Sequence, residues 1–483
     1  MGELLDKRKF YINGEWVAPA ARHDLEVIDP STEEAVAVIS LGAQADTDRA
    51  VAAAKAAFPA WSKTAPAERL AHVEKILAIY KRRATEMAAA MTLEMGAPQD
   101  MALAAQTGAG SYHIETFITA FKEFEFIRPL GPHAPTTMVA WEPIGVVGLI
   151  TPWNWPMNQV TLKVIPAILG GNTCVLKPSE IAPLSSLLFA EIVDEAGLPP
   201  GVFNLVNGDG PGVGTQLSTH PDVGMISFTG STRAGIAISK AAADTLKKVA
   251  LELGGKGANL IFADADSKAV ERGTRHCFNN SGQSCNAPTR MLVQRDIYEM
   301  AVATAARVAE ETKVATAHQP GGHIGPVVSK QQWEKIQGLI QQGIDEGARL
   351  VAGGPGLPEG VNRGYFVRPT VFADVTNQMT IARQEIFGPV LSIIPFDTEE
   401  EAVEIANDTI YGLTNYVQSQ DGTRRNRLAR QLRAGMVEMN GESRGAGSAF
   451  GGIGASGRAR EGGWMGLEEF MDSKFISGWS INA

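Results

Sequence analysis

The sequence predicts an α/β protein built on a parallel, doubly wound sheet, with a second α/β series later in the chain. Between residues 144 and 254, short apolar runs alternate with stretches of helical periodicity, at the spacing of βαβ units. A second alternating series begins near Asn259 and runs to about Asn440. Sheets of this kind bind ligands at the carboxyl ends of their strands, so the loops after the strands are the first candidates for a functional site.

The individual elements follow from local patterns. Asn13-Gly14 separates two apolar runs near the N-terminus, which is a hairpin signal. From Asp46 to about Met95 the pattern is helical and rich in alanine. In the first series we expect strands at 144–150, 173–176, 202–206, 224–228 and 248–253, and helices near 157–169 and 183–196. The segment 124–140 interrupts this series with little helical period, and the tail 474–482 alternates like a strand.

Composition and charge narrow the class of protein. Of 483 residues, 44% are hydrophobic and 20% charged, which is ordinary for a globular protein. The formal charge of −10 argues against a nucleic-acid or anionic-membrane partner. The chain has no run of eighteen apolar residues and no apolar segment of a secretory signal in its first residues. Three cysteines at irregular spacing form no disulfide framework or metal motif, so we expect a reducing, cytoplasmic location and no metal.

Four loops follow strands of the first series, at 151–156, 177–180, 208–214 and 228–232. Two of them are glycine-rich and precede helices, which suits an anionic pyrophosphate. Lys177 could bind ribose hydroxyls or phosphate, and Glu180 could accept a hydrogen bond from a ribose 2′-hydroxyl while repelling a 2′-phosphate. The alternative is that the glycines only turn the chain and both charges are solvated. A literal Gly-x-Gly-x-x-Gly at 452–457 follows no apolar strand, so we interpret it as a structural loop.

Cys285 is the candidate nucleophile. It follows a helical stretch that ends in small polar residues, and a proline comes three residues later. A thiol on such a loop is more reactive than one in a core, although it needs helix N-terminal amides or a nearby cation to raise its thiolate fraction. Cys174 and Cys277 have apolar contexts and are interpreted as core residues.

Glu252 is the candidate general base. It ends an apolar strand just before Gly254-Gly255, where desolvation would raise the pKa of its carboxyl group. The alternative is a helix cap or a salt bridge with Lys256.

At these residues the chain resembles the aldehyde dehydrogenase superfamily over nearly its whole length. Seven motifs match in the family's order, at 152–156, 177–180, 228–231, 252–256, 282–285, 385–389 and 450–452. The resemblance implies a Rossmann-type cofactor domain (1–123 and 141–253), an α/β catalytic domain (254–455) and a small β oligomerisation arm (124–140 and 456–483). It further implies oxidation of an aldehyde to its acid, through a cysteine thiohemiacetal and thioester, by a homodimer or homotetramer.

The resemblance also assigns residue roles. Cys285 is the implied nucleophile, Glu252 the base and Asn154 an oxyanion-hole donor, while Lys163 and Glu461 match a proton relay behind the base. The implied contacts of the cofactor, NAD rather than NADP, are Ile150, Thr151, Trp153, Lys177, Ser179, Glu180, Gly210, Gly214, Phe228, Thr229, Gly230, Ser231, Leu253, Glu385 and Phe387.

Departures from the family pattern concern the substrate. Asn279 stands where many members have an aromatic residue near the pocket, Glu438 where many have Trp, and Asn158 and Gln159 follow the oxyanion-hole asparagine. We expect a polar or semi-polar aldehyde, with a broadly aliphatic pocket as the alternative. Three other functions remain open: a coenzyme-A-acylating dehydrogenase, against which Glu252 argues; a non-catalytic protein of the same fold; and a thiol esterase, which would not need the cofactor loops.

Overall fold

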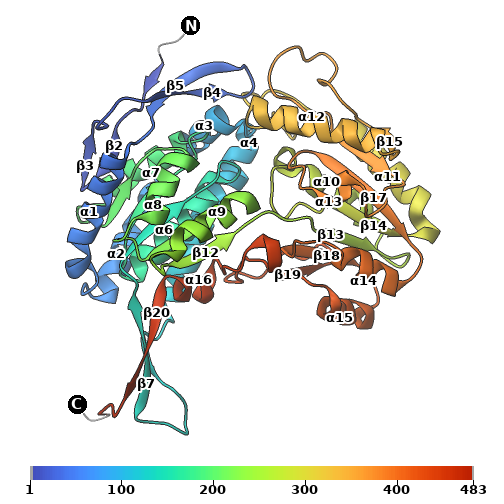
Figure 1. Cartoon of the computed structure of the whole chain (residues 1–483). Helices are drawn as coiled ribbons and strands as arrows, with labels where there is room; N and C mark the ends of the chain where they lie inside the picture. The colour runs from blue at the N-terminus through green and yellow to red at the C-terminus, as the bar shows by residue number, and fades with distance from the viewer. Residues whose placement is uncertain (1–3, 481–483) are drawn as a thin grey trace.

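The computed structural model describes residues 4–480 and shows two lobes with an arm projecting from the first (Figure 1). The last two residues of the predicted tail strand, 481 and 482, lie outside the described residues. A seven-stranded sheet lies in each lobe, and a three-stranded sheet forms the arm. No helix within residues 4–480 is long and apolar enough to cross a membrane.

The sheet of the first lobe has the order β12-β11-β8-β9-β10-β2-β3. Its parallel strands are β8 (Val146–Ile150), β9 (Thr173–Lys177), β10 (Phe203–Leu205), β11 (Met225–Thr229) and β12 (Lys248–Glu252). The predicted hairpin closes one edge as β2 (Phe10–Ile12) and β3 (Glu15–Val17), with Asn13 and Gly14 both at positive φ. The doubly wound sheet predicted from the alternating pattern is therefore confirmed.

Helices cover both faces of this sheet (Figure 1). They are α1 (Gln44–Trp61), α2 (Pro66–Arg82), α3 (Ala84–Met95), α4 (Gln99–Met101), α5 (Gly108–Lys122), α6 (Pro156–Leu169), α7 (Leu184–Glu195), α8 (Thr215–Thr219) and α9 (Thr232–Ala243). Every residue of α6 except Asn158 is buried, because this helix lies between the sheet and α5. Its sequence therefore carries Lys163 into the core, and its first turn begins with Pro156, which has no amide hydrogen to leave unpaired.

The second lobe holds the sheet β15-β16-β17-β14-β13-β18-β19. The strands are β13 (Ala258–Ile261), β14 (Arg290–Gln294), β15 (Arg349–Ala352), β16 (Thr370–Ala373), β17 (Val390–Phe396), β18 (Thr414–Gln418) and β19 (Met436–Met439). The helices are α10 (Ala269–Phe278), α11 (Tyr298–Glu311), α12 (Lys330–Asp345), α13 (Thr380–Arg383), α14 (Glu399–Asn407) and α15 (Gly422–Gln431). All pairs are parallel except β15 with β16, so this lobe is a second βα series, as predicted.

The arm combines two segments far apart in sequence. Strands β6 (Ile127–Pro129) and β7 (Thr137–Pro143) pair with β20 (Met471–Ser477) in an antiparallel sheet. β7 continues past residue 140, and the segment 456–470, including α16 (Gly463–Glu469), packs into the main body rather than into the arm. The domain boundaries themselves stay a prediction.

Another small sheet, near the N-terminus, joins β1 (Leu5–Asp6), β4 (Asp24–Asp29) and β5 (Glu34–Ser40).

Candidate active site

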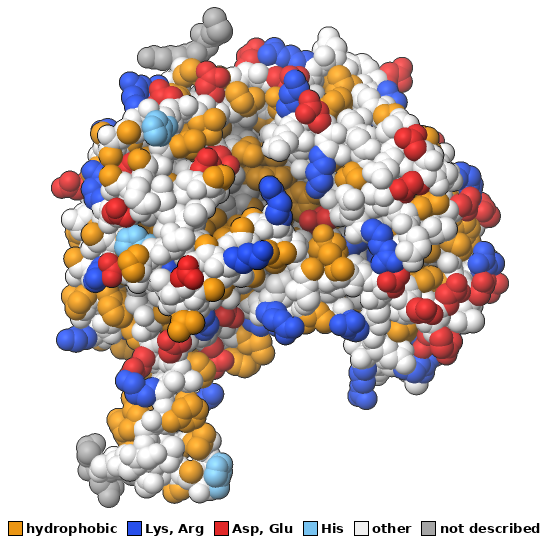
Figure 2. Space-filling model, in the orientation of Figure 1, with side chains coloured by type: hydrophobic (Ala, Val, Ile, Leu, Met, Phe, Trp, Pro, Cys, Tyr) orange, Lys and Arg blue, Asp and Glu red, His pale blue; other side chains and the backbone are white. Residues whose placement is uncertain are grey.

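A hollow between the two lobes exposes hydrophobic side chains, with lysine and arginine side chains at its rim (Figure 2). The chain crosses from one lobe to the other directly after β12, through Gly254 and Gly255. A Cβ atom on Gly255 would lie 2.5 Å from the Cys285 carbonyl oxygen, so the two backbones touch. The end of β12 and the Cys285 loop are thus brought together, although more than thirty residues separate them.

The loop before Cys285 has a strained backbone. Asn280, Ser281 and Gly282 lie in succession in the left-handed region, with φ of 52°, 56° and 73°. Only glycine adopts this conformation without steric cost, so the surroundings must hold the other two residues. Asn280 Nδ2 donates to the Asn154 carbonyl oxygen (2.9 Å), and Ser281 Oγ donates to that of Gly325 (2.7 Å). The side chain of Gln283 accepts from Val328 N (2.9 Å).

Asn154 is fixed beside this loop. Its Nδ2 donates to the Gln283 carbonyl oxygen at 3.0 Å, two residues before Cys285. Its own carbonyl oxygen accepts from Gln106 and Asn280. One amide hydrogen of Asn154 is used in the Gln283 bond, and the second is a candidate donor to an oxyanion. Sequence reasoning missed the positioning residues Gln106 and Asn280, which no local pattern distinguishes from other polar side chains, and it gave no role to Gln283 although this residue lies in the motif at 282–285.

Glu252 is a buried carboxyl group without a hydrogen-bond partner. It is 2% exposed, and among the described residues neither carboxyl oxygen has a partner. The alternative of a salt bridge with Lys256 is wrong, since Lys256 Nζ is also buried without a partner. Burial, with the nearby charge of Glu461, raises the pKa of Glu252 well above its ordinary value, although Lys163 and Arg460 oppose this. The predicted desolvation is confirmed.

Lys163 and Glu461 form a buried ion pair close to Glu252. Lys163 Nζ donates both to Glu461 and to Thr229 Oγ1, the latter at 2.7 Å. Glu461 is held by a two-way backbone bridge with Phe450. The hydroxyl of Thr229, a predicted cofactor contact, therefore belongs to this network. The structure brings together three of the predicted catalytic residues from β12, α6 and the C-terminal segment.

The three cysteines differ as predicted in burial. Cys174 and Cys277 are fully buried, and burial raises the pKa of the Cys277 thiol to about 12. Cys285 is partly exposed, yet its thiol is enclosed, and burial followed by the charge of Glu252 raises its pKa. The charges of Glu385 and Glu461 raise the pKa of the Cys285 thiol further, and the charge of Arg444 opposes this rise. The expected activating cation or helix terminus therefore does not dominate the thiol's surroundings in this structure.

The loops at the carboxyl ends of the first sheet form the predicted rim. Lys177 Nζ donates to the Gly208 carbonyl oxygen (2.6 Å) and contacts Glu180 Oε2 (3.2 Å). Asp209 caps the next turn by accepting from Gly212 N (2.6 Å), so this amide is not free for an anion. A Cβ on Gly214 would lie 4.0 Å from Lys177 Cδ, which places Gly214 beside the lysine.

The rim fits a polar dinucleotide. Within residues 4–480, Thr151 Oγ1 and both side-chain atoms of Asn207 are buried without a partner beside Lys177 and Gly208. Such atoms are rare in native proteins and are expected where a ligand supplies the missing bonds. The remaining predicted contacts lie at or next to these strand ends: Ile150, Ser179, Gly210, Phe228, Gly230, Ser231 and Leu253. Of these, Ser231 Oγ caps α9, Phe228 packs on Gly230, and Leu253 packs on Gly235.

Glu385 and Phe387, from the second lobe, contact the segment after β12 and Trp153 of the first-lobe rim. Glu385 Oε1 accepts from Gly255 N (3.0 Å), and a Cβ on Gly254 would lie 2.3 Å from Glu385 Oε2. The rings of Trp153 and Phe387 meet edge to face at 5.4 Å. Phe387 has φ of +61°, a strained value that is typical of functional sites. These residues link the cofactor rim to the end of β12.

The polar residues expected in the aldehyde pocket have different surroundings. Asn158 Oδ1 is bound to His113 Nε2 at 2.7 Å, and Gln159 is buried. Asn279 is exposed, in a surface hollow of about 470 Å³ that it shares with Arg272, Tyr416 and Glu438. The polar pocket for the aldehyde stays a prediction.

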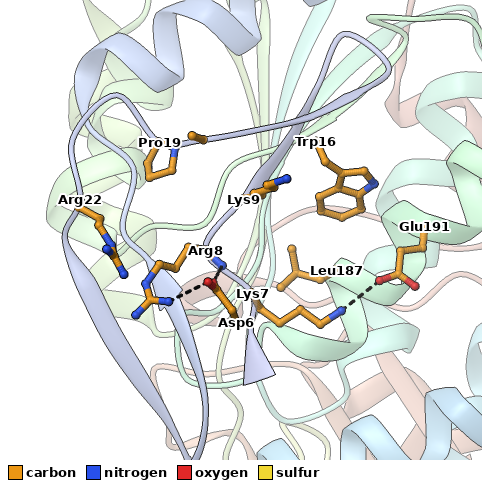
Figure 3. Close-up of a pocket in the computed structure, with 10 residues that line it drawn as sticks. Asp6, Lys7, Arg8, Lys9, Trp16, Pro19, Arg22, Leu187 and Glu191 are labelled. Carbon is orange, nitrogen blue, oxygen red and sulfur yellow. Dashed lines mark hydrogen bonds and ion pairs between the residues drawn. The ribbon is translucent and has the colours of Figure 1, made fainter. Parts of the chain in front are cut away.

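A larger hollow of about 830 Å³ lies at the N-terminal strands, beside α7 (Figure 3). Trp16, Lys9 and Leu187 line it together with charged residues. Lys7 is paired with Glu191 (3.1 Å), and Arg8 is paired with Asp24 (2.9 Å), so most of its charge is neutralised. It is separate from the residues around Cys285.

A thiol and a buried carboxyl group at the junction of two α/β lobes, beside a dinucleotide-type rim, define a cysteine-dependent dehydrogenase. The comparisons specify which kind. The sequence profile of the "Aldehyde dehydrogenase family" matches residues 16–476. The chain belongs to the aldehyde dehydrogenase family, and its reaction is the oxidation of an aldehyde to a carboxylic acid.

Three relatives illustrate the similarity. The crystal structure of an aldehyde dehydrogenase from Bartonella henselae is 66% identical, with TM-score 0.98 over 99% of this chain and 100% of that one. A variant of aldehyde dehydrogenase C from Pseudomonas syringae, in complex with NAD⁺ and octanal, is 47% identical, with TM-score 0.96 over 99% and 98%. A 3-succinoylsemialdehyde-pyridine dehydrogenase from Pseudomonas sp. is 50% identical over 99% of both chains.

Proposed function

We propose that Cys285 is the nucleophile and Glu252 the general base of an NAD-dependent oxidation of an aldehyde to its acid. The observation that carries this proposal is the partnerless buried carboxyl group of Glu252 beside the Cys285 loop. A buried polar atom without a partner costs free energy, so a purely structural role for Glu252 would leave that cost without compensation.

The proposed chemistry follows from these positions. Cys285 Sγ adds to the aldehyde carbon as the thiolate, the electron pair of the carbonyl bond moves to the oxygen, and the second amide hydrogen of Asn154 stabilises the resulting oxyanion of the thiohemiacetal. When bound, NAD supplies the hydride acceptor. Loss of hydride leaves a thioester on Cys285 Sγ. Glu252, once ionised, removes a proton from water, whose oxygen adds to the thioester carbon, and the Cys285 thiolate leaves as the acid forms.

Lys163 and Glu461 serve in this proposal as the path for the proton that Glu252 receives. Their ion pair lies behind the base, and Glu461 Oε2 has no partner among the described residues. Glu461 Oε2 is thus the oxygen in this pair that is left to receive the proton. Thr229 holds Lys163 in place through its hydroxyl.

The preference for NAD over NADP rests on Glu180. Its carboxylate lies at the rim, about one-third exposed, next to Lys177 Nζ. It is placed to accept a hydrogen bond from a ribose 2′-hydroxyl and to repel a 2′-phosphate. Two relatives crystallised with NAD⁺ support the same choice.

Self-association, as a homodimer or homotetramer, is proposed from the arm. Its strands expose Ile127 (49%) and Phe475 (63%), and Leu130 (44%) follows β6. Exposed apolar residues on one projection typically mark a protein interface. Sedimentation velocity tests self-association: a monomer at micromolar concentration would contradict it.

A reducing, cytoplasmic compartment is proposed from the three unpaired cysteines.

The chemistry is tested by following reduced nicotinamide and acid product with a panel of aldehydes, with and without coenzyme A. We expect turnover that needs no coenzyme A and yields free acid. Acyl-coenzyme A as the product would show the acylating alternative, hydrolysis of an ester together with no oxidation of aldehydes would show an esterase, and no turnover with any aldehyde would contradict the proposal.

A further inference from the structure

Arg444 is an arginine that the proposed mechanism does not use. It follows β19 in the chain, and about one-third of its side chain (34%) is exposed. Its Nε lies 3.2 Å from Glu438 Oε1, one η nitrogen lies 3.2 Å from Met436 Sδ, and its Cζ lies 4.7 Å from the centroid of the Phe450 ring. Among the described residues, the second η nitrogen has no partner.

On one side, contacts through strand β18 connect Arg444 with the Cys285 loop. Glu438 is the cross-strand neighbour of Tyr416, and the Tyr416 hydroxyl donates to the Asn286 carbonyl oxygen at 2.7 Å. Asn286 directly follows Cys285. This short series of contacts places Glu438 and its partner Arg444 close to the thiol.

On the other side, Phe450 links Arg444 to the base. Phe450 N donates to the Glu461 carbonyl oxygen at 2.7 Å, and Glu461 N donates back to Phe450 O at 2.8 Å. Glu461 is the partner of Lys163 behind Glu252. The ring of Phe450 therefore holds the guanidinium plane beside the centre that contains both the thiol and the base.

The charge of Arg444 acts on several groups around this centre. It opposes the rise in the pKa of the Cys285 thiol that burial causes, and it adds to the lowering of the pKa of His113, which burial brings to about 4. His113 is therefore neutral at physiological pH and donates Nε2–H to Asn158 Oδ1. Arg444 is thus a permanent cation near Cys285 that has no part in the proposed mechanism, whereas His113 carries no charge.

We propose that Arg444 is a specificity-determining residue that selects aldehydes with a hydrogen-bond acceptor, a carboxylate or ketone oxygen, several bonds from the aldehyde carbon. The proposal rests on the proposed role of Cys285. A guanidinium donates hydrogen bonds and accepts none, and Glu438 occupies only its ε edge. Because Glu438 is paired with Arg444, a preference for a cationic aldehyde does not follow from it.

The test compares four aldehydes of equal chain length: an unsubstituted alkanal, its ω-carboxylate, a keto analogue and an ω-ammonium analogue. We expect the wild-type kcat/KM to be highest for an acceptor-bearing aldehyde and lowest for the cationic one. In Arg444→Met, kcat/KM for that acceptor-bearing aldehyde falls about tenfold or more, while that of the alkanal stays within about twofold. The loss falls on KM, because the contact is remote from the reacting atoms.

The matched control is Arg425→Met. Arg425 lines the same surface hollow of about 450 Å³ as Arg444, but its guanidinium is bound to the Ser419 carbonyl oxygen (2.6 Å). This variant should leave all four substrates unchanged. Arg444→Lys should rescue the carboxylate better than the ketone, since Lys keeps the charge without the planar fork.

Three results would overturn the inference: an equal loss for all four aldehydes in Arg444→Met, no loss for either acceptor-bearing aldehyde, or the same pattern in Arg425→Met. Each leaves aldehyde oxidation by the wild type intact. Absence of any turnover by the wild type would instead contradict the proposed role of Cys285, so the two failures are distinguishable.

Discussion

Two buried charged groups, one in each lobe, are treated in opposite ways by the fold. Arg290 in the second lobe is fully buried, and its guanidinium donates to Lys256 O (3.0 Å), Asn377 Oδ1 (2.9 Å), Ile405 O (2.9 Å) and Ala406 O (2.9 Å). Glu252 at the end of β12 is as deeply buried, yet both its oxygens lack partners.

The difference indicates that Arg290 is buried for stability and Glu252 for its chemical reactivity. Arg290 joins strand β14 to the segment before β13, the loop before α13 and the last turn of α14, so its hydrogen bonds stabilise the second lobe. The carboxyl group of Glu252 makes no hydrogen bond that stabilises the fold, and its raised pKa is typical of a group that exchanges a proton. Removing Arg290 should therefore cost stability, and removing the charge of Glu252 should cost activity.

The largest effect is expected at the thiol. Cys285→Ser should lower kcat by about 10⁴-fold or more, because a hydroxyl in this loop is a far weaker nucleophile. Cys174→Ser and Cys277→Ser place a hydroxyl in the core and should lower the free energy of unfolding while keeping the chemistry. Steady-state assays with thermal unfolding distinguish the two kinds of loss, and full activity in Cys285→Ser would remove it from the mechanism.

The comparison is tested directly by stability. Arg290→Met leaves several buried acceptors unpaired and should lower the free energy of unfolding by on the order of 3 kcal/mol or more. Glu252→Gln should leave it unchanged or raise it, because no hydrogen bond is lost and a desolvated charge is removed. Denaturant unfolding of both variants measures the two changes in the free energy of unfolding. A strongly destabilised Glu252→Gln would mean that the carboxyl group has a structural role.

A third buried ionisable group, Glu94, sharpens the comparison. Glu94 accepts from the Leu184 and Ser185 amides at the start of α7, yet burial raises its pKa from 4.5 to about 7. The folded protein then binds more protons than the unfolded chain between these values. Glu94 should therefore contribute most stability below pH 4.5, and this contribution should be lost as the pH rises through about 7. Glu94→Gln should flatten that slope in unfolding curves measured across this pH range.

The smallest effect concerns the cofactor. Glu180→Thr removes the charge that faces a 2′-phosphate and should narrow the ratio of kcat/KM for NAD over NADP by about tenfold, near the value of one exposed charge contact. Lys177, left without its partner, should then favour the phosphate. A wild-type enzyme with the higher kcat/KM for NADP would show that Glu180 does not set the preference.

The sequence predicted the elements that repeat a pattern. Alternation of apolar runs and helical stretches located β8 to β12, and Asn13-Gly14 located the hairpin, because both depend on neighbours in the chain. The arm was visible as an interruption at 124–140, but its extent was not, since the end of β7 depends on pairing with β20 far along the chain.

Within the site, residues with motif context were found and those with only tertiary context were missed. Cys285 and Glu252 lie in recognisable motifs, whereas Gln106 and Arg444 reach the site through long-range contacts that no local pattern encodes. The same limit explains Asn279, which follows the end of α10 and faces a surface hollow. The hydroxyl of Thr229, at the end of β11, accepts a hydrogen bond from Lys163 of α6, and this contact joins residues 66 positions apart in the chain.

The central claim is that Glu252 acts after hydride transfer, on the Cys285 thioester. Rapid mixing of Glu252→Gln with NAD and an aldehyde tests it most directly, with intact-protein mass measured on quenched samples. The account predicts a burst of about one reduced nicotinamide per active site, a mass increase equal to the acyl group on Cys285, and very slow acid release. A steady-state rate equal to that of the wild type, or a stalled enzyme without a burst or bound acyl group, would contradict it.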